Sequence, residues 1–411
     1  MGQSLCRSCG ATLDQTFVDL GMSSLANTYI RPEQLNHMEP FYPLHVYVCE
    51  KCLLVQLEQF SSPHDIFSDY AYFSSFSDSW LAHAKAYVDM IVERFHLDQK
   101  AKVVEIASND GYLLKNFVAR GIPVLGIEPA ANVAEVAKKN GINTRVAFFG
   151  EKTAIDLKRD GWSANLIIGN NVLAHVPELN EFVKGLKVLL KPMGLITMEF
   201  PHLFQLMEHN QFDTIYHEHF SYFSFLAVEQ IFACHGMRLF DVEELPTHGG
   251  SLRIYACHDQ DDSKPIQSQV RDLKSREKLA GFGELNHYLS FAPKVEATKR
   301  KLLSFLISAR QEGKRVVGYG APAKGNTLLN YCGVRTDLID YTVDRSPYKQ
   351  GHFLPGVHIP IYAPEQIRQT RPDYVLILPW NLRDEVMQQM AFIYEWGGKF
   401  VVPIPEVKVY P

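Results

Sequence analysis

Two pairs of cysteines near the amino terminus have the spacing of metal ligands. "CRSC" supplies Cys6 and Cys9, and "CEKC" supplies Cys49 and Cys52. A C-x-x-C pair can present both sulfurs to one ion, and two pairs complete a tetrahedral thiolate shell that suits zinc. Four free thiols or a redox pair are the alternatives. Because four thiolates leave no open coordination position, we expect Zn²⁺ with a structural role. We expect the other three cysteines in the core: Cys234, Cys257 and Cys332.

The stretch "TIYHEHFSY", residues 214–222, combines two histidines, a glutamate and two tyrosines. In a strand, His217 and His219 would face the same side as a pair of metal ligands, and Glu218 would face away. Histidine is also the side chain whose pKa suits a general base near neutral pH. A polar strand edge is the third interpretation. The stretch alone leaves all three open.

The elements that could position these residues begin with "AKVVEIASNDGYLLKNFVARGIPVLGIEPA". The pattern predicts a buried strand over 103–106, a turn over 107–111, a helix from Tyr112, and a second strand that ends at Glu128. This order is typical of nucleotide binding, in which the acid bonds ribose hydroxyls. Only Gly111 remains of a G-x-G-x-x-G fingerprint, which counts against NAD. A nucleotide other than NAD could bind this loop, or the strands and helix could form an α/β core that binds no ligand.

Two further predicted strands end in polar residues. "ANLIIGNNVLAHV" places Asn170, Asn171 and His175 after its strand, and "GLITMEFPH" ends near Glu199 and His202. Ligands of open α/β sheets bind outside the carboxyl ends of the strands. We therefore expect these polar residues at one ligand-binding edge.

The carboxyl-terminal third predicts a second Rossmann-like unit. "GKRVVGYGAPAKGN" reads as a strand, an open turn and a helix, with a lysine beside the helix start that suits a phosphate. The turn lacks the P-loop pattern, which disfavours ATP hydrolysis. A loop rich in Arg, Lys and Tyr follows the next strand and could hold a diphosphate and stack on a base. A degenerate fold that only packs is the alternative. The expected substrate-binding residues are Lys324, Arg345, Tyr348, Lys349 and His352.

Taken in order, the cysteine pairs, "EIASNDGYLL", "GIEPA", "GNNVLAHVP", "YHEHFSYFS", "HGGSLRIYA" and "GYGAPAKGNTLL" resemble the sugar C-methyltransferases. The resemblance covers nearly the whole chain. It implies transfer of a methyl group from S-adenosylmethionine (SAM) to carbon 3 of a nucleotide-linked 4-keto-6-deoxysugar, in deoxysugar or surface-polysaccharide biosynthesis. The nucleotide would be dTDP or GDP. The loop is similar to the SAM loop of class I methyltransferases, which implies these cofactor-binding residues: Glu105, Ala107, Asn109, Gly111, Glu128, Pro129 and Asn170.

The chemistry of a 4-ketosugar requires a base, because the ketone acidifies the neighbouring C–H and an enolate carbon then attacks the methyl group. By the resemblance, His219 is that base. An O- or N-methyltransferase, a non-catalytic sugar-nucleotide-binding regulator and an NAD oxidoreductase are the alternatives. The resemblance further implies that Tyr216 and Glu218 orient the sugar and the imidazole, that Asn171 and His175 contact the sugar or the enolate, and that Tyr70 helps to close the site.

At 411 residues the chain is too long for one core. We expect an α/β protein with a zinc-binding module (1–66), a class I methyltransferase domain (67–256) and a Rossmann-like sugar-nucleotide domain (257–411). The net charge of −5 and the absence of a basic stripe argue against nucleic acid. No apolar run reaches the length of a membrane span, and the first residues lack a secretory signal. We expect a cytoplasmic protein that could act as a monomer.

Overall fold

The structure, a computed structural model, describes residues 4–60, 74–76 and 78–411. The chain forms two compact units, each assembled from three separate stretches. Unit 1 comprises Met1–Leu13, Cys49–His202 and Phe220–Gly283, and unit 2 comprises Asp14–Val48, Leu203–His219 and Glu284–Pro411. The three sequence domains stay a prediction. Among the described helices, none has the length and apolar character to cross a bilayer.

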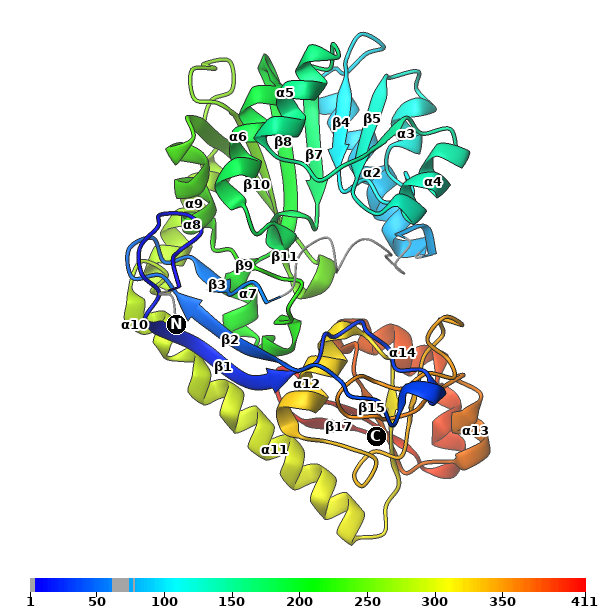
Figure 1. The fold of residues 1–411 in the computed structure, drawn as a ribbon. Helices are drawn as coiled ribbons and strands as arrows, with labels where there is room; N and C mark the ends of the chain where they lie inside the picture. The colour runs from blue at the N-terminus through cyan, green and yellow to red at the C-terminus, as the bar shows by residue number, and fades with distance from the viewer. Residues whose placement is uncertain (1–3, 61–73, 77) are drawn as a thin grey trace. The chain divides into compact units, whose positions relative to one another are not determined.

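Unit 1 is built on a seven-stranded sheet in the order β10-β11-β8-β7-β4-β5-β6. The strands pair in parallel except β11, which is antiparallel to both neighbours. The chain adds strands to one side of β4 and then to the other, so β4 and β7 border the switch point at which α/β sheets bind ligands. In Figure 1 these strands run from cyan to green: β4 Val103–Ile106, β5 Val124–Glu128, β6 Thr144–Val146, β7 Ala164–Asn170, β8 Leu190–Pro201, β10 Met237–Leu245 and β11 Ser251–His258.

Apolar helix faces cover this sheet. In α2, Tyr87, Val88 and Ile91 are buried in the same core cluster as Val103 of β4. The helix expected from Tyr112 begins only at Lys115, because residues 111–114 form a bend and turn after the loop. The helices of unit 1 are α2 Asp78–Arg94, α3 Lys115–Val118, α4 Ala131–Lys139, α5 Glu151–Arg159, α6 Leu179–Leu189, α8 Phe225–Cys234 and α9 Ser268–Leu279, with 3-10 turns η2 Ser74–Phe76, η3 Leu173–His175 and η5 Thr247–Gly249.

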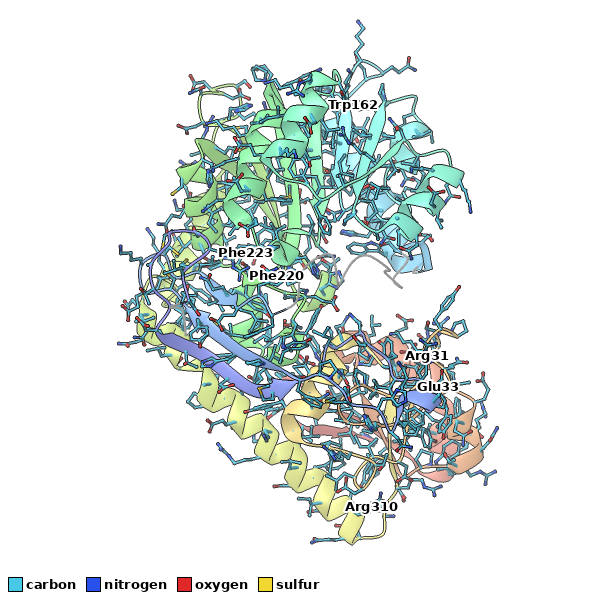
Figure 2. All side chains as sticks on the ribbon, in the orientation of Figure 1. Arg31, Glu33, Trp162, Phe220, Phe223 and Arg310 are labelled. Atoms are coloured by element: carbon cyan, nitrogen blue, oxygen red, sulfur yellow. The ribbon has the colours of Figure 1, made fainter. Side chains whose placement is uncertain are left out.

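A short antiparallel pair, β3 (Val55–Leu57) with β9 (Ser221–Tyr222), also belongs to unit 1. Phe220 and Phe223, labelled in Figure 2, flank β9 and are buried. The backbone N–H of Phe220 donates to the carbonyl of Ala174 at 2.7 Å. This bond ties the end of "TIYHEHFSY" to the 3-10 turn that carries His175.

Unit 2 contains a six-stranded sheet in the order β14-β13-β12-β15-β16-β17. Its pairs are parallel except β16 with β17. This is the expected Rossmann-like unit, and its switch point lies between β12 and β15. Its elements are β12 Val316–Tyr319, α12 Ala323–Cys332, β13 Thr342–Val343, β14 Ile361–Tyr362, α13 Gln366–Thr370, β15 Tyr374–Ile377, η6 Trp380–Leu382, α14 Arg383–Gln389, η7 Ala391–Trp396, β16 Lys399–Val402 and β17 Lys408–Tyr410.

An amino-terminal hairpin joins unit 2. Strands β1 (Gln15–Ser23) and β2 (Tyr42–Val48) pair antiparallel, and the ring of Phe17 stacks on Phe291 with centroids 4.8 Å apart. Blue β1 accordingly lies beside yellow α11 in Figure 1. The remaining elements are η1 Pro32–Gln34, which carries Glu33 next to Arg31 (both labelled in Figure 2), α7 Leu203–Glu208, η4 Phe212–Thr214, α10 Leu285–Leu289 and α11 Phe291–Gln311.

The cysteines outside the two pairs do not all lie in the core. Cys257 and Cys332 are buried as expected, but Cys234 is exposed. It is the last residue of α8, where the helix leaves the apolar face that Val228 and Ile231 bury. The expectation of a core position was wrong for Cys234.

Candidate active site

The four paired cysteines converge in unit 1. Their sulfur atoms all lie within 4.8 Å of one another, and the pairs Cys6–Cys52 and Cys9–Cys49 are each 3.5 Å apart. A tetrahedral shell with Zn–S of about 2.3 Å separates its sulfurs by about 3.8 Å. The hydrogen bond between Cys6 and Cys52 lowers the pKa of Cys6 and raises that of Cys52, and burial raises the pKa of Cys49, so a bound cation is needed to ionise all four thiols. The donor set therefore fits a structural zinc ion.

The loop after β4 folds as a nucleotide-binding loop. Ala107, Asn109 and Gly111 all have left-handed φ angles, between 50° and 81°. At Gly111 a Cβ would lie 2.6 Å from Cγ1 of Ile142, so the position requires glycine. The Asn109 N–H donates to Oε2 of Glu128 at 2.9 Å. The loop and the acid at the end of β5 therefore meet, as the sequence pattern predicts.

Two buried carboxylates flank this loop. Glu128 accepts a second bond, from the Ala130 N–H at 2.8 Å, and burial raises the pKa of its carboxyl. Burial, reinforced by Glu128 and Asp110, raises the pKa of Glu105 well above the usual value. Among the described residues, none donates to Oε2 of Glu105. Such an acceptor fits a ligand that brings hydroxyl or ammonium donors, as SAM does. Pro129 is half-buried beside Glu128, and Asn170 is buried at the end of β7.

Beyond β7, two strained residues bond to each other. Asn171 and His248 both have positive φ, 53° and 55°, and the Asn171 amide lies 2.8 Å from Nε2 of His248. Trp80 contacts the His248 ring edge-on at 5.3 Å. Strain of this kind gathers at functional sites, because it persists only where the surrounding structure enforces it. His248 was not singled out by its sequence. His175 is half-buried in η3, and Tyr70 lies outside the described residues.

A buried charge network lies at the end of β8. Oε2 of Glu199 is 3.0 Å from Nε2 of His83 and accepts from Nη2 of Arg253 at 2.9 Å. Thr247 donates to the other oxygen. Burial opposes the charge of Glu199, but His83 and Arg253 together bring its pKa below the usual value. Sequence reasoning found Glu199 but missed its partners, since they come from α2, η5 and β11.

His202, expected at the ligand-binding edge, has a structural partner. Its Nε2 lies 2.7 Å from Oε1 of Glu277, and both side chains are buried. The same carboxylate accepts the N–H groups of Phe225 and Leu226 at the start of α8. His202 therefore belongs to a helix-capping cluster.

Residues 216–219 of "TIYHEHFSY" belong to unit 2 and form a turn where the metal interpretation assumed a strand. The His219 N–H bonds to the Tyr216 carbonyl at 2.9 Å, which closes a β-turn over residues 216–219. Nε2 of His217 lies 3.2 Å from the carbonyl of Pro43, and burial lowers the pKa of this imidazole. The turn thus gives His217 and His219 separate carbonyl partners. The only group of three or more candidate metal ligands found in the described chain is the cysteine cluster.

The imidazole of His219 is buried and oriented. Its Nδ1 lies 3.0 Å from the carbonyl of Thr214. A carbonyl oxygen can only accept, so Nδ1 carries the proton and Nε2 carries the lone pair of the neutral ring. The Tyr216 ring packs against the imidazole with centroids 4.0 Å apart. Glu218 accepts from the amide of Asn27 at 2.6 Å, and burial raises the pKa of its carboxyl.

Two of the expected substrate-binding residues, Lys324 and Lys349, lie at the loop after β12. Lys349 donates to the carbonyl of Ala321 at 2.9 Å, and the hydroxyl of Tyr29 donates to the same oxygen at 2.6 Å. The Ala321 N–H donates to Asp344 at 2.8 Å. Lys324 lies above the Trp380 ring, 4.3 Å from its centroid. Both lysines therefore contact the switch-point elements of the second sheet.

The other three predicted residues of this loop are less constrained. Arg345 is 69% exposed and lies 3.9 Å from Glu385. Tyr348 is 66% exposed. His352 is half-buried, with Nδ1 3.2 Å from the carbonyl of Gln350. Their role in substrate binding stays a prediction.

The chain is similar to known proteins over all three parts of its sequence. Family models match a zinc binding domain over residues 6–67, a methyltransferase domain over 80–242 and a C-methyltransferase C-terminal domain over 246–405. The C-methyltransferase NovU of Streptomyces niveus is 37% identical over 404 residues, which cover 98% of this chain and 96% of NovU. The ubiquinone biosynthesis O-methyltransferase of Bartonella bacilliformis is 28% identical over 29% of this chain and 51% of its own. Magnesium protoporphyrin IX methyltransferase of Synechocystis, solved with bound SAH, covers 43% of this chain and 83% of its own at 15% identity and a TM-score of 0.34.

The family matches, the loop after β4 and the cysteine cluster define a SAM-dependent methyltransferase with a zinc-binding module. The chain belongs to the C-methyltransferase family that its motifs resemble, that of the sugar C-methyltransferases. The predicted α/β fold class, the SAM cofactor and the structural zinc are thereby confirmed.

Proposed function

We propose that this C-methyltransferase acts on carbon 3 of a nucleotide-linked 4-keto-6-deoxysugar, with His219 as the general base. The observation that carries the proposal is the bond between Nδ1 of His219 and the Thr214 carbonyl, at 3.0 Å. It fixes the tautomer in which Nε2 can accept a proton. The proposed place of the reaction is deoxysugar or surface-polysaccharide biosynthesis.

The proposed reaction has two steps, removal of a proton and transfer of a methyl group. Nε2 of His219 takes the proton from carbon 3, and the electron pair of that C–H bond forms the enolate. SAM, when bound by Glu105, Glu128 and the loop between them, supplies the methyl group. The enolate carbon would take this methyl as the bond from sulfur to the methyl group breaks, which would leave SAH and restore the ketone. Burial of the imidazole limits competing protonation by water.

The remaining roles follow from the same chemistry. Tyr216 packs on the imidazole, and Glu218, whose pKa burial raises, is suited to bond a sugar hydroxyl. Asn171 and His175 are proposed to contact the sugar or the enolate oxygen, and Tyr70 to help close the site. The cations Lys324, Arg345 and Lys349, with Tyr348 and His352, are proposed to hold a dTDP or GDP moiety.

The test is mass spectrometry of reactions that contain SAM and a panel of nucleotide-linked 4-keto-6-deoxysugars. We expect a product one methylene heavier with the wild type. His219→Asn keeps a donor for the Thr214 carbonyl but has no base, so turnover should fall by about 10²–10⁴-fold while SAM still binds. His209→Ala, an exposed histidine of unit 2, is the matched control and should retain activity.

Deuterium exchange isolates the proton transfer. In D₂O with SAH in place of SAM, the wild type should exchange the proton at carbon 3 of the ketosugar, and His219→Asn should not. No methylation of any ketosugar despite SAM binding would refute the substrate class. Methylation that His219→Asn leaves intact would refute the base.

A further inference from the structure

Asp213 is a buried acid that the proposed mechanism does not use. It lies in η4, three residues before the first residue of the "YHEH" turn, and its side chain is fully buried. Nε1–H of Trp380 donates to its Oδ2 at 2.7 Å. Its Oδ1 has no hydrogen-bond partner among the described residues. Burial raises the pKa of this carboxyl to about 7. Burial of an ionisable carboxyl destabilises the folded state, so the position of Asp213 calls for an explanation.

The Trp380 side chain that bonds to Asp213 also contacts a cation, Lys324. The Nζ of Lys324 lies 4.3 Å from the centroid of the Trp380 ring and donates to Oδ1 of Asn381 at 2.9 Å. Burial lowers the pKa of Lys324 and raises that of Asp213, and the charge of each group opposes the shift of the other. Lys324 and Trp380 come from α12 and η6, which follow the two strands at the switch point of the second sheet.

The segment that carries Asp213 also carries the partner of the base. Thr214 comes next, and its carbonyl accepts from Nδ1 of His219. Oγ1 of Thr327 in α12 donates to the carbonyl of Ile215 at 2.9 Å. The residues that orient the imidazole are therefore attached at two points to elements that follow strands of the second sheet, through Asp213 to η6 and through Ile215 to α12.

We propose that Asp213 is a positioning residue for His219, which holds the Thr214 carbonyl in place through Trp380 and Lys324. This inference rests on the proposed role of His219 as the base. A displacement of the carbonyl would turn the imidazole, and a misplacement of about 1 Å in a catalytic group can cost about 10²-fold in rate. The nucleotide loop, which includes Lys324, would then share a support with the base.

Two substitutions test the proposal in the full-length, zinc-loaded chain. Asp213→Asn keeps an acceptor for the Trp380 indole, but it removes the charge and buries an amide N–H where Oδ1 has no partner. Trp380→Phe removes the donor. We expect each to lower kcat by about 10- to 100-fold, with the KM for the ketosugar and the Kd for SAM within about threefold of wild type. Asp340→Asn is the matched control, since Asp340 is a half-buried acid of unit 2 that pairs with Arg310 and Arg315.

A double-mutant cycle shows whether Asp213 acts through the base. In the His219→Ala background, Asp213→Asn should cause no further loss, because there is no imidazole left to orient. The proposal is overturned if Asp213→Asn leaves kcat unchanged, raises only KM, or lowers kcat no more than Asp340→Asn does. It is also overturned if Asp213→Asn lowers the residual rate of His219→Ala by the same factor as the rate of the wild type. A wild-type chain that methylates no ketosugar would overturn the proposed function as well, whereas an active wild type with an equally active Asp213→Asn overturns this inference alone.

Discussion

Buried carboxyl groups mark both candidate ligand sites. Burial raises the pKa of Glu105 and Glu128 in unit 1 and that of Asp213 and Glu218 in unit 2. Glu199 differs, because His83 and Arg253 compensate its burial and bring its pKa below the usual value. The same side-chain type is thus tuned in two directions by its neighbours. A buried carboxyl whose pKa is raised destabilises the ligand-free protein when it is ionised. It suits a ligand whose hydroxyl or ammonium groups donate hydrogen bonds to it.

Glu105→Gln should stabilise the ligand-free protein, and more so at higher pH. The folded pKa of Glu105 exceeds its unfolded value, so the folded state holds this proton more tightly and stability falls as pH rises between the two values. Over that interval the loss for the wild type is at most about 1.4 kcal/mol per pH unit. Glutamine lacks the effect, so the Tm advantage of Glu105→Gln should grow from pH 5 to pH 8.

Differential scanning calorimetry without SAM measures this difference. Glu93→Gln, an exposed acid on α2, serves as the control and should show a gap near zero at both pH values. A Tm advantage that shrinks with rising pH would contradict the burial argument for Glu105.

At the scale of elements, local patterns were predictable and distant partners were not. The loop 107–111, the acid at the end of β5 and the turn before α12 each follow from residues close in sequence. Asn27 with Glu218, and Trp380 with Asp213, join positions 191 and 167 residues apart. No periodicity encodes such pairs. The strand that the metal interpretation of "YHEH" requires does not form, because these polar residues make a turn with separate backbone partners.

The start of α8 depends on one distant side chain. Glu277 accepts the N–H groups of Phe225 and Leu226 at 2.6 and 2.9 Å and contacts His202 at 2.7 Å, all in buried surroundings. Glu277→Ala leaves these donors without an acceptor, so we expect the free energy of unfolding to fall by about 3–5 kcal/mol. Urea denaturation followed by circular dichroism measures this loss.

Glu229→Ala is the control for that loss. Glu229 lies on α8 and pairs with Lys274 at 2.7 Å, but both side chains are partly exposed, so its removal should cost less than about 1 kcal/mol. If the two variants lose equal stability, the cap does not hold α8 as the structure indicates.

At the scale of the whole molecule, the same topology occurs twice. Unit 1 contains β6-β5-β4-β7-β8 and unit 2 contains β14-β13-β12-β15-β16, each with strands added to one side of the first strand and then to the other. Each unit therefore has its own switch point and its own ligand-binding edge. The acidic loop of unit 1 suits the donors of SAM, and the cationic loop of unit 2 suits a diphosphate. We therefore propose two chemically opposite sites in one chain.

The two sites should be separable by mutation. Glu128→Gln removes the carboxylate that meets the SAM loop, and Arg345→Ala removes an exposed cation that lies 3.9 Å from Glu385. By calorimetric titration of the full chain, Glu128→Gln should weaken SAM binding by about tenfold or more and leave the Kd for TDP unchanged. Arg345→Ala should do the reverse. Arg371→Ala, a surface arginine that follows α13 in unit 2, is the control for lost positive charge. If Arg345→Ala weakened SAM as much as TDP, the assignment of the diphosphate to unit 2 would fail, because a cation of the second sheet would then serve the methyl donor.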